Sequence, residues 1–115
     1  MTCDYMLKIH CSDEKMGFVS QVLEAEPTET EYGYWGLGIS EKGSQGPIDY
    51  VGQFLELLGG KFERLMDLGV ARGDISVWVY CEYSGQCGLE FPSDDLMRLG
   101  VNGLDLCISC WETVE

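Results

Sequence analysis

Cysteine is the residue with the widest chemical range in this 115-residue sequence, and two of its six copies form a CxxC motif. Cys107 and Cys110 have the spacing found in zinc knuckles and thioredoxin-type redox sites. Residues 104–109, however, alternate apolar and polar side chains, which is typical of a half-buried strand. Residues three apart on a strand point to opposite faces, so both thiols can bind one ion only across a bulge, with Cys81 and Cys87 completing the site. We therefore predict no metal and no cofactor.

The oxidation state of the thiols depends on the compartment. The segment from Met1 to Cys11 lacks the basic region and the apolar stretch of a signal peptide. We therefore expect a cytoplasmic protein, where disulfides are rare and cysteine packs as a small hydrophobe. Free, partly buried thiols are predicted at Cys3, Cys11, Cys81, Cys87, Cys107 and Cys110.

No combination of residues indicates catalysis. His10 is the only histidine, and it is predicted on the strand face opposite Leu7 and Ile9, as an ordinary, partly exposed side chain. The glycine-rich residues 33–38 lack the strand-then-helix context of a dinucleotide loop. A Walker lysine, an HExxH pair and a calcium loop are also missing from the sequence. We predict a protein that is not an enzyme and has no catalytic residues.

Acidic side chains outnumber basic ones by 20 to 7, which leaves a formal net charge of −13. Such a surface repels phosphates, so the charge argues against direct binding of nucleic acid and of anionic membranes. Four carboxylates crowd into residues 24–31, and residues 73–115 carry eight acids against one base, Arg98. These acids either keep the protein soluble or attract a basic protein partner.

The apolar pattern predicts one α+β domain over residues 1–115, since 45% apolar residues are ample for one core. The expected architecture is a two-layer sandwich with a mostly antiparallel sheet, the order β-α-β-α-β-β-α-β, and helices on one face. A helix over 47–69 is interrupted at Gly59-Gly60, where it kinks or two helices meet. The predicted strands are 5–11, 34–39, 75–82, 87–91 and 104–111, with helices after Ser12 and Ser93 as N-caps, an exposed loop at 41–46, and a hairpin turn at Ser84-Gly85.

The sheet face away from the apolar stripes combines large aromatic and acidic side chains. Trp78, Tyr80 and Glu82 on one strand are expected near Asp105, Cys107, Ser109 and Trp111 on another, with Tyr32 and Tyr34 close by. Interfaces favour Trp and Tyr as anchors, so we interpret this face as an interaction surface. A second covering layer or a homodimer seam are the alternatives. The predicted partner-binding residues are Trp78, Tyr80, Glu82, Asp94, Asp95, Asp105 and Trp111.

The elements between Pro47 and Trp111 also follow a recognisable succession. A long helix with an apolar stripe is followed by a strand, a glycine turn, a short return strand, and a helix leading into the last strand. The residues concerned are Phe54, Leu55, Leu58, Leu65 and Leu68, the strand 75–83, Ser84-Gly85-Gln86, Leu89-Glu90-Phe91, Ser93 to Gly100 and 104–110, with Gly33-Tyr34-Trp35 before the helix. This succession resembles the bacterial family catalogued as domain of unknown function 4279. The resemblance implies a small bacterial protein without assigned catalytic residues, in a family where some members look like immunity partners of secreted toxins.

Three classes of function follow from these patterns. The leading hypothesis is an immunity protein that neutralises a basic toxin or nuclease; a phage-type inhibitor of a nucleic-acid-binding complex would use the same electrostatics. The first alternative is a homo-oligomeric housekeeping domain with Trp78 and Trp111 at a dimer seam. The second is a metal or redox module built from Cys81, Cys87, Cys107 and Cys110.

Overall fold

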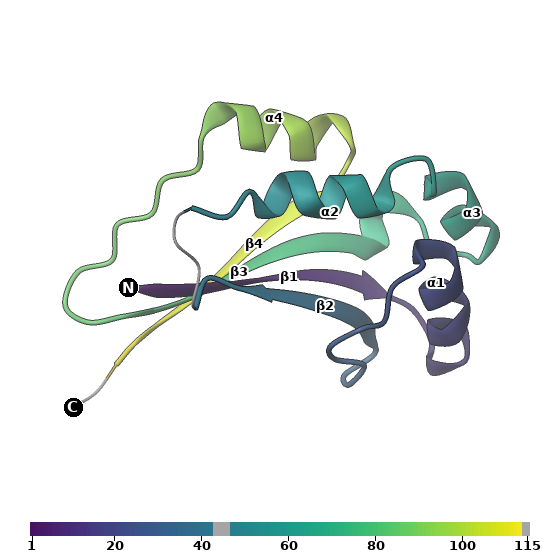
Figure 1. Cartoon of the computed structure of the whole chain (residues 1–115), viewed down its shortest axis with the longest axis horizontal. Coiled ribbons are helices and arrows are strands. Elements are labelled where there is room, and N and C mark those ends of the chain that lie inside the picture. The colour runs from purple at the N-terminus through teal and green to yellow at the C-terminus, as the bar shows by residue number, and fades with distance from the viewer. Residues whose placement is uncertain (43–46, 114–115) are drawn as a thin grey trace.

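A four-stranded mixed sheet organises the chain in the computed structural model, which describes residues 1–42 and 47–113 (Figure 1). The strands lie in the order β2-β1-β3-β4. β1 pairs antiparallel with both β2 and β3, whereas β4 runs parallel to β3. The protein is therefore an α+β fold with a mostly antiparallel sheet, as the sequence predicted. The strand bounds are β1 Thr2–His10, β2 Tyr34–Ser40, β3 Ile75–Tyr83 and β4 Asp105–Glu112.

The α-helices are drawn to one side of the sheet, with α2 lying along it and α4 raised beyond α2 (Figure 1). In the described part of the chain, no helix is long and apolar enough to cross a membrane. The helices are α1 Met16–Leu23, α2 Tyr50–Leu58, α3 Phe62–Asp67 and α4 Ser93–Val101, with short 3-10 turns η1 Asp13–Lys15 and η2 Arg72–Asp74.

Strand alternation separates a core face from an open face. Leu7 of β1 lies between Leu37 of β2 and Val77 of β3, and Leu7 and Val77 are fully buried. Trp35 follows the same alternation, is also fully buried, and donates its indole N–H to Ser20 Oγ on α1 at 2.9 Å. Burying each such side chain contributes roughly 1.5–3 kcal/mol, so this face directs the helices onto the sheet.

The segment predicted as one interrupted helix folds as two. α2 begins at Tyr50 rather than at Pro47, because the Asp49 carboxylate accepts a hydrogen bond from Gly52 N at 3.0 Å and caps the first turn. Gly60 has φ +74°, a left-handed conformation that glycine adopts without steric cost. The chain therefore turns between α2 and α3, which resolves the choice between a kink and a junction in favour of a junction.

The predicted return strand over residues 87–91 is wrong, and the expected order β-α-β-α-β-β-α-β loses its sixth element. These residues have no strand assignment, and β3 leads through this segment into α4. β1 and β4 occupy the two edges of β3, so a hairpin strand has no backbone partner available. The structure places β4 there in parallel, through the crossover helix α4.

Two capping predictions are also corrected. Ser12 precedes the 3-10 turn η1 and makes no capping hydrogen bond through its side chain. Ser93 is the first residue of α4, and Pro92 holds the capping position. Of the exposed loop predicted at 41–46, residues 43–46 lie outside the described part of the chain.

Candidate functional site: the open sheet face

The open face of the sheet gathers most of the predicted site residues. In the parallel register of β3 and β4, Trp78 lies beside Cys107, Tyr80 beside Ser109, and Glu82 beside Trp111. Asp105 begins the same row next to Ser76. The alternation that buries Val77 and Val79 thus directs the intervening side chains away from the helices.

Lys8 lies at the centre of this face, and the sequence-based site did not include it. Its ammonium group lies 3.9 Å from the centroid of the Trp78 ring, 4.4 Å from that of Tyr34 and 5.3 Å from that of Tyr80. All three separations fall within the ~6 Å range of cation–π attraction. Lys8 is only 9% exposed to solvent, so its aliphatic stem packs among the rings while its ammonium group contacts their faces.

The rings around Lys8 are held in place by further contacts. Trp78 and Tyr80 stack with centroids 5.7 Å apart and an interplanar angle of 15°. The Trp78 indole N–H donates to Ser76 Oγ at 2.9 Å. Tyr34 is buried, and burial first and a hydrogen bond to Glu29 second raise the pKa of its hydroxyl. These contacts hold the aromatic side chains in place in the free protein, and a surface that is already ordered loses less entropy in any binding event.

Tyr32 and Trp111 extend this aromatic surface outward. Tyr32 is 82% exposed, and its ring centroid lies 6.5 Å from that of Tyr34. Trp111 is 46% exposed near the end of β4. His10 also lies on this face, with its ring edge-on to Tyr34 at 6.1 Å. We call the surface formed by Lys8, Tyr34, Trp78, Tyr80 and Trp111 the aromatic face.

A shallow hollow of about 240 Å³ adjoins the aromatic face over β2. A glycine in its lining helps to explain it, because a Cβ at Gly38 would lie 3.3 Å from Thr28 Oγ1. The hollow has an acidic wall and an apolar floor, so it suits the aliphatic stem and cationic head of a lysine or arginine side chain. Its lining residues include Asp4, Met6, Thr28, Gly38, Ser40 and Tyr80.

Asp94 and Asp95, the other two predicted partner-binding residues, do not lie on this face. They lie in the first turn of α4, which is drawn on the helix side of the sheet (Figure 1). Both form ion pairs with Arg98 on the same helix, at 3.5 Å and 2.5 Å, and Arg98 also reaches Asp49 at 3.0 Å. The Arg98 hydrogen bond first, and the Gly52 N–H second, lower the pKa of Asp49. These carboxylates therefore connect α4 to the start of α2.

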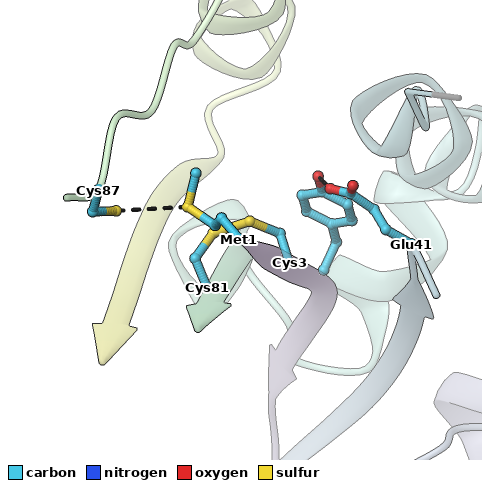
Figure 2. Close-up of a disulfide and its surroundings, with 6 residues drawn as sticks. Met1, Cys3, Glu41, Cys81 and Cys87 are labelled. Atoms are coloured by element: carbon cyan, nitrogen blue, oxygen red, sulfur yellow. Dashed lines mark hydrogen bonds between the residues drawn. A yellow bond between two sulfur atoms is a disulfide. The ribbon is translucent and has the colours of Figure 1, made fainter. Parts of the chain in front are cut away.

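The prediction that every cysteine is a free thiol is wrong for Cys3 and Cys81, which form a disulfide (Figure 2). They are directly opposite in the β1–β3 register, with Cα atoms 4.2 Å apart. Cys107 lies on the open face, where burial first and Asp105 second raise the pKa of its thiol. Cys110, three residues along β4, lies on the opposite face, as the strand period predicted. Residues 1–42 and 47–113 contain no group of three or more side chains suited to hold a metal ion.

Sequence reasoning missed Lys8 as a site residue although its pattern carried the signal. Alternation along β1 already placed Lys8 and Met6 opposite Leu7 and Ile9, on the outward face. The pattern does not show which strand lies next to β1. Only the β1–β3 register puts Lys8 beside Ser76 and Met6 beside Trp78.

Comparisons with protein-family models, with curated proteins and with solved structures found no match to this chain.

Proposed function

We propose that this chain is a non-enzymatic acidic binding protein that neutralises a basic protein partner, as a cytoplasmic immunity protein against a secreted bacterial toxin or nuclease. A phage-type inhibitor of a nucleic-acid-binding complex fits the same description of the partner. The observation that carries the proposal is the aromatic face, an ordered cluster of large rings on a sheet side that the helices leave open.

The aromatic face has the composition of a binding hot spot. Tryptophan and tyrosine dominate such spots because each buries a large area at a low cost in side-chain entropy. Trp78 and Tyr80 are partly buried and already ordered by Lys8, whereas Trp111 offers an exposed ring at the edge strand. A partner therefore meets a pre-organised centre and one ring free to adapt.

Charge selects the partner. Asp4, Glu82 and Asp105 are exposed around the aromatic face, and the chain carries a net charge of −13. A nuclease or another nucleic-acid-binding effector must be cationic to hold phosphates, so the acidic rim complements its surface and accelerates encounter. The hollow beside Asp4 provides a seat for one basic side chain of that partner.

The test begins with the product of the adjacent reading frame, because immunity genes are usually neighbours of their toxins. Binding of that purified product is measured for the wild type and for W78A, Y80A and W111A. Each substitution should weaken affinity by about 2 kcal/mol or more, close to thirtyfold, as expected for hot-spot residues. Met97→Ala is the matched control, since Met97 is 60% exposed on α4 and should leave affinity unchanged. An equal loss in M97A, or a partner that is acidic, would refute the proposal.

Charge reversal separates steering from contact. E82K and D105K should mainly slow association, and the loss should shrink as salt screens the field within a Debye length of ~8 Å. Glu63→Lys is the matched control, because it changes the net charge by the same amount as E82K or D105K but at an exposed position on α3. The association rate of this variant with the partner should therefore fall less. Association rates that ignore salt would contradict the electrostatic part of the proposal.

A homodimer seam is the second candidate, because β4 has a strand neighbour on one side only and its Ile108 and Trp111 are each 46% exposed. Size-exclusion chromatography with light scattering decides between the two. A monomer at high concentration removes the seam, whereas a W111A-sensitive dimer would replace the proposal of a foreign partner.

A further inference from the structure

The two edges of the sheet differ in how their backbone groups are hydrogen-bonded. At the β2 edge, the chain before the strand covers Gly36: Thr28 N and Glu29 N donate to Gly36 O at 2.7 Å and 3.1 Å, and Gly36 N donates to Glu29 O at 2.8 Å. Thr28 Oγ1 also accepts a hydrogen bond from Gly38 N at 2.8 Å. The β2 edge therefore cannot pair with another strand without losing these bonds.

The β4 edge is free. β4 lies at the end of the strand order, and in residues 1–42 and 47–113 the backbone of 105–112 forms no hydrogen bond outside its pairing with β3. Alternate residues of a parallel strand direct their N–H and C=O groups toward the neighbour, so the intervening residues direct theirs outward. Natural sheets usually blunt such an edge with lysine, proline or a bulge. β4, with the sequence DLCISCWE, has no lysine or proline and pairs with β3 in unbroken register.

The helix side of β4 also leaves apolar side chains uncovered. Ile108 lies beside Val79 in the register and on the same face, yet Ile108 is 46% exposed whereas Val79 is 2% exposed. Leu106, two residues earlier, is only partly buried. The helix layer thus covers β3 but ends short of the middle of β4. A strand added beyond β4 would place its own apolar side chains beside Ile108 and bury it further.

Charge distinguishes the possible occupants of this edge. β4 begins with Asp105 and ends with Glu112, and no basic residue lies between them. Antiparallel pairing of two copies over the whole strand puts Asp105 of each copy opposite Glu112 of the other, and like charges directly opposite each other destabilise a strand pair. A strand with lysine or arginine at both ends meets opposite charges there instead. It also meets the exposed ring of Trp111, which attracts cationic side chains.

We propose that the free edge of β4 is a docking site for an extended, amphipathic strand of a basic protein, which extends the four-stranded sheet. One row of the incoming strand is apolar and packs beside Ile108, and the other row carries lysine or arginine toward Asp105 and Trp111. Main-chain hydrogen bonds to β4 supply affinity, and the alternate side chains supply specificity. The docking site rests on the proposed function, because the strand belongs to the same basic partner that contacts the aromatic face.

The test uses a synthetic peptide that alternates valine and lysine and has the eight-residue length of β4. Fluorescence anisotropy of the labelled peptide measures its affinity for the purified wild-type protein. Amide hydrogen exchange shows where the peptide pairs, since a new backbone hydrogen bond protects the amide that donates it. We expect added protection at alternate residues of β4 and none in β2, whose edge is already hydrogen-bonded.

Two modified peptides separate backbone pairing from attraction by charge. One is N-methylated at every valine and the other at every lysine, so both keep the side chains and the charge of the parent peptide. Only one set of amides can face β4. The peptide methylated on that set should bind at least about tenfold more weakly, because carbonyl groups of β4 lose their donors, and the other should bind like the parent.

Ile108→Lys tests the protein side of the same contact. The new charge meets the apolar row of the incoming strand, so the affinity for the parent peptide should fall at least about tenfold. Met97→Lys is the matched control, since Met97 is 60% exposed on α4 and the change in net charge is the same. The affinity of M97K should fall much less. Circular dichroism establishes that both variants are folded, and the methylated peptides test the wild type if I108K is not.

Several results would overturn the proposal. They are no binding of the parent peptide, equal binding of the two methylated peptides, and added protection confined to residues outside β4. Light scattering that shows a wild-type dimer which the peptide dissociates would assign the edge to a second copy instead. Failure of the peptide does not affect the Trp78 hot-spot test with the neighbouring gene product, and failure of that test leaves the peptide result unchanged.

Discussion

Removing the Lys8 charge tests whether the aromatic face is held together by cation–π contacts. The perturbation is a double-mutant cycle of Lys8→Met and Trp78→Leu. Methionine keeps the aliphatic stem of Lys8, and leucine keeps apolar bulk at Trp78 without a ring. The Lys8 ammonium lies 3.9 Å from the Trp78 centroid, and Lys8 is only 9% exposed. Cation–π pairs contribute about 0.5–1 kcal/mol when exposed and about 2 kcal/mol when desolvated, so we expect a coupling of about 1–2 kcal/mol.

The cycle is needed because neither single substitution isolates the contact. Lys8→Met also removes the desolvation cost of a nearly buried ammonium group, which offsets part of the loss. Trp78→Leu also removes the stack on Tyr80 and the hydrogen bond to Ser76. These other effects occur in both backgrounds and cancel in the coupling free energy.

Urea unfolding followed by circular dichroism supplies the four free energies. The matched control is a cycle of Lys8→Met with Trp111→Leu, because Trp111 lies at the far end of the face, beside Glu82 rather than Ser76. That control should be additive within ~0.3–0.5 kcal/mol. A Lys8–Trp78 coupling no larger than the control coupling would refute the role of Lys8 in ordering the rings.

Three further predictions test the rest of the fold. The lowered pKa of Asp49 means that its ion pair contributes stability above the unfolded-state pKa and that this stability is lost as pH falls through the folded-state value. The hydrogen-exchange protection factors of α4, which correct for the pH dependence of intrinsic exchange, should therefore fall on acidification in the wild type and change less in R98L. W35A should cost about 3–5 kcal/mol in unfolding free energy, whereas W111A, at an exposed ring, should cost far less, as measured by urea titration. Because the disulfide joins residues 78 apart, its reduction by dithiothreitol should lower the unfolding free energy by up to ~4.5 kcal/mol, and C3A should lose this sensitivity to reductant.

Local pattern accounts for what was predicted correctly about the open face. The two-residue period of β3 separates Trp78 and Tyr80 from the buried Val77 and Val79 wherever the strand is placed. The same period separates Cys107 from Cys110, and no tertiary contact is required to know it. Asp94 and Asp95 were likewise recognisable as the acidic first turn of a helix, although not which side of the molecule that helix would occupy.

The pairing of strands that are distant in the sequence could not be predicted from the sequence. A strand signal followed by Ser84-Gly85 suggested a hairpin, but the free edge of β3 is filled by β4 after the α4 crossover. Strand pairing depends on which arrangement buries the most apolar surface, a property of the whole chain rather than of any window. Side chains from all four strands pack into one core on the helix-covered face of the sheet. This packing favours β4, rather than a return strand, as the neighbour of β3.

The sequence by itself determined the α+β class, the outward direction of the aromatic and acidic side chains, and the net negative charge, because each follows from composition or from a period of two. Only the tertiary structure decided that Lys8 lies among three rings and that Cys3 and Cys81 are bonded. Those contacts join residues far apart in the chain. Their proximity comes from the strand order β2-β1-β3-β4, which long-range burial sets and local sequence does not encode.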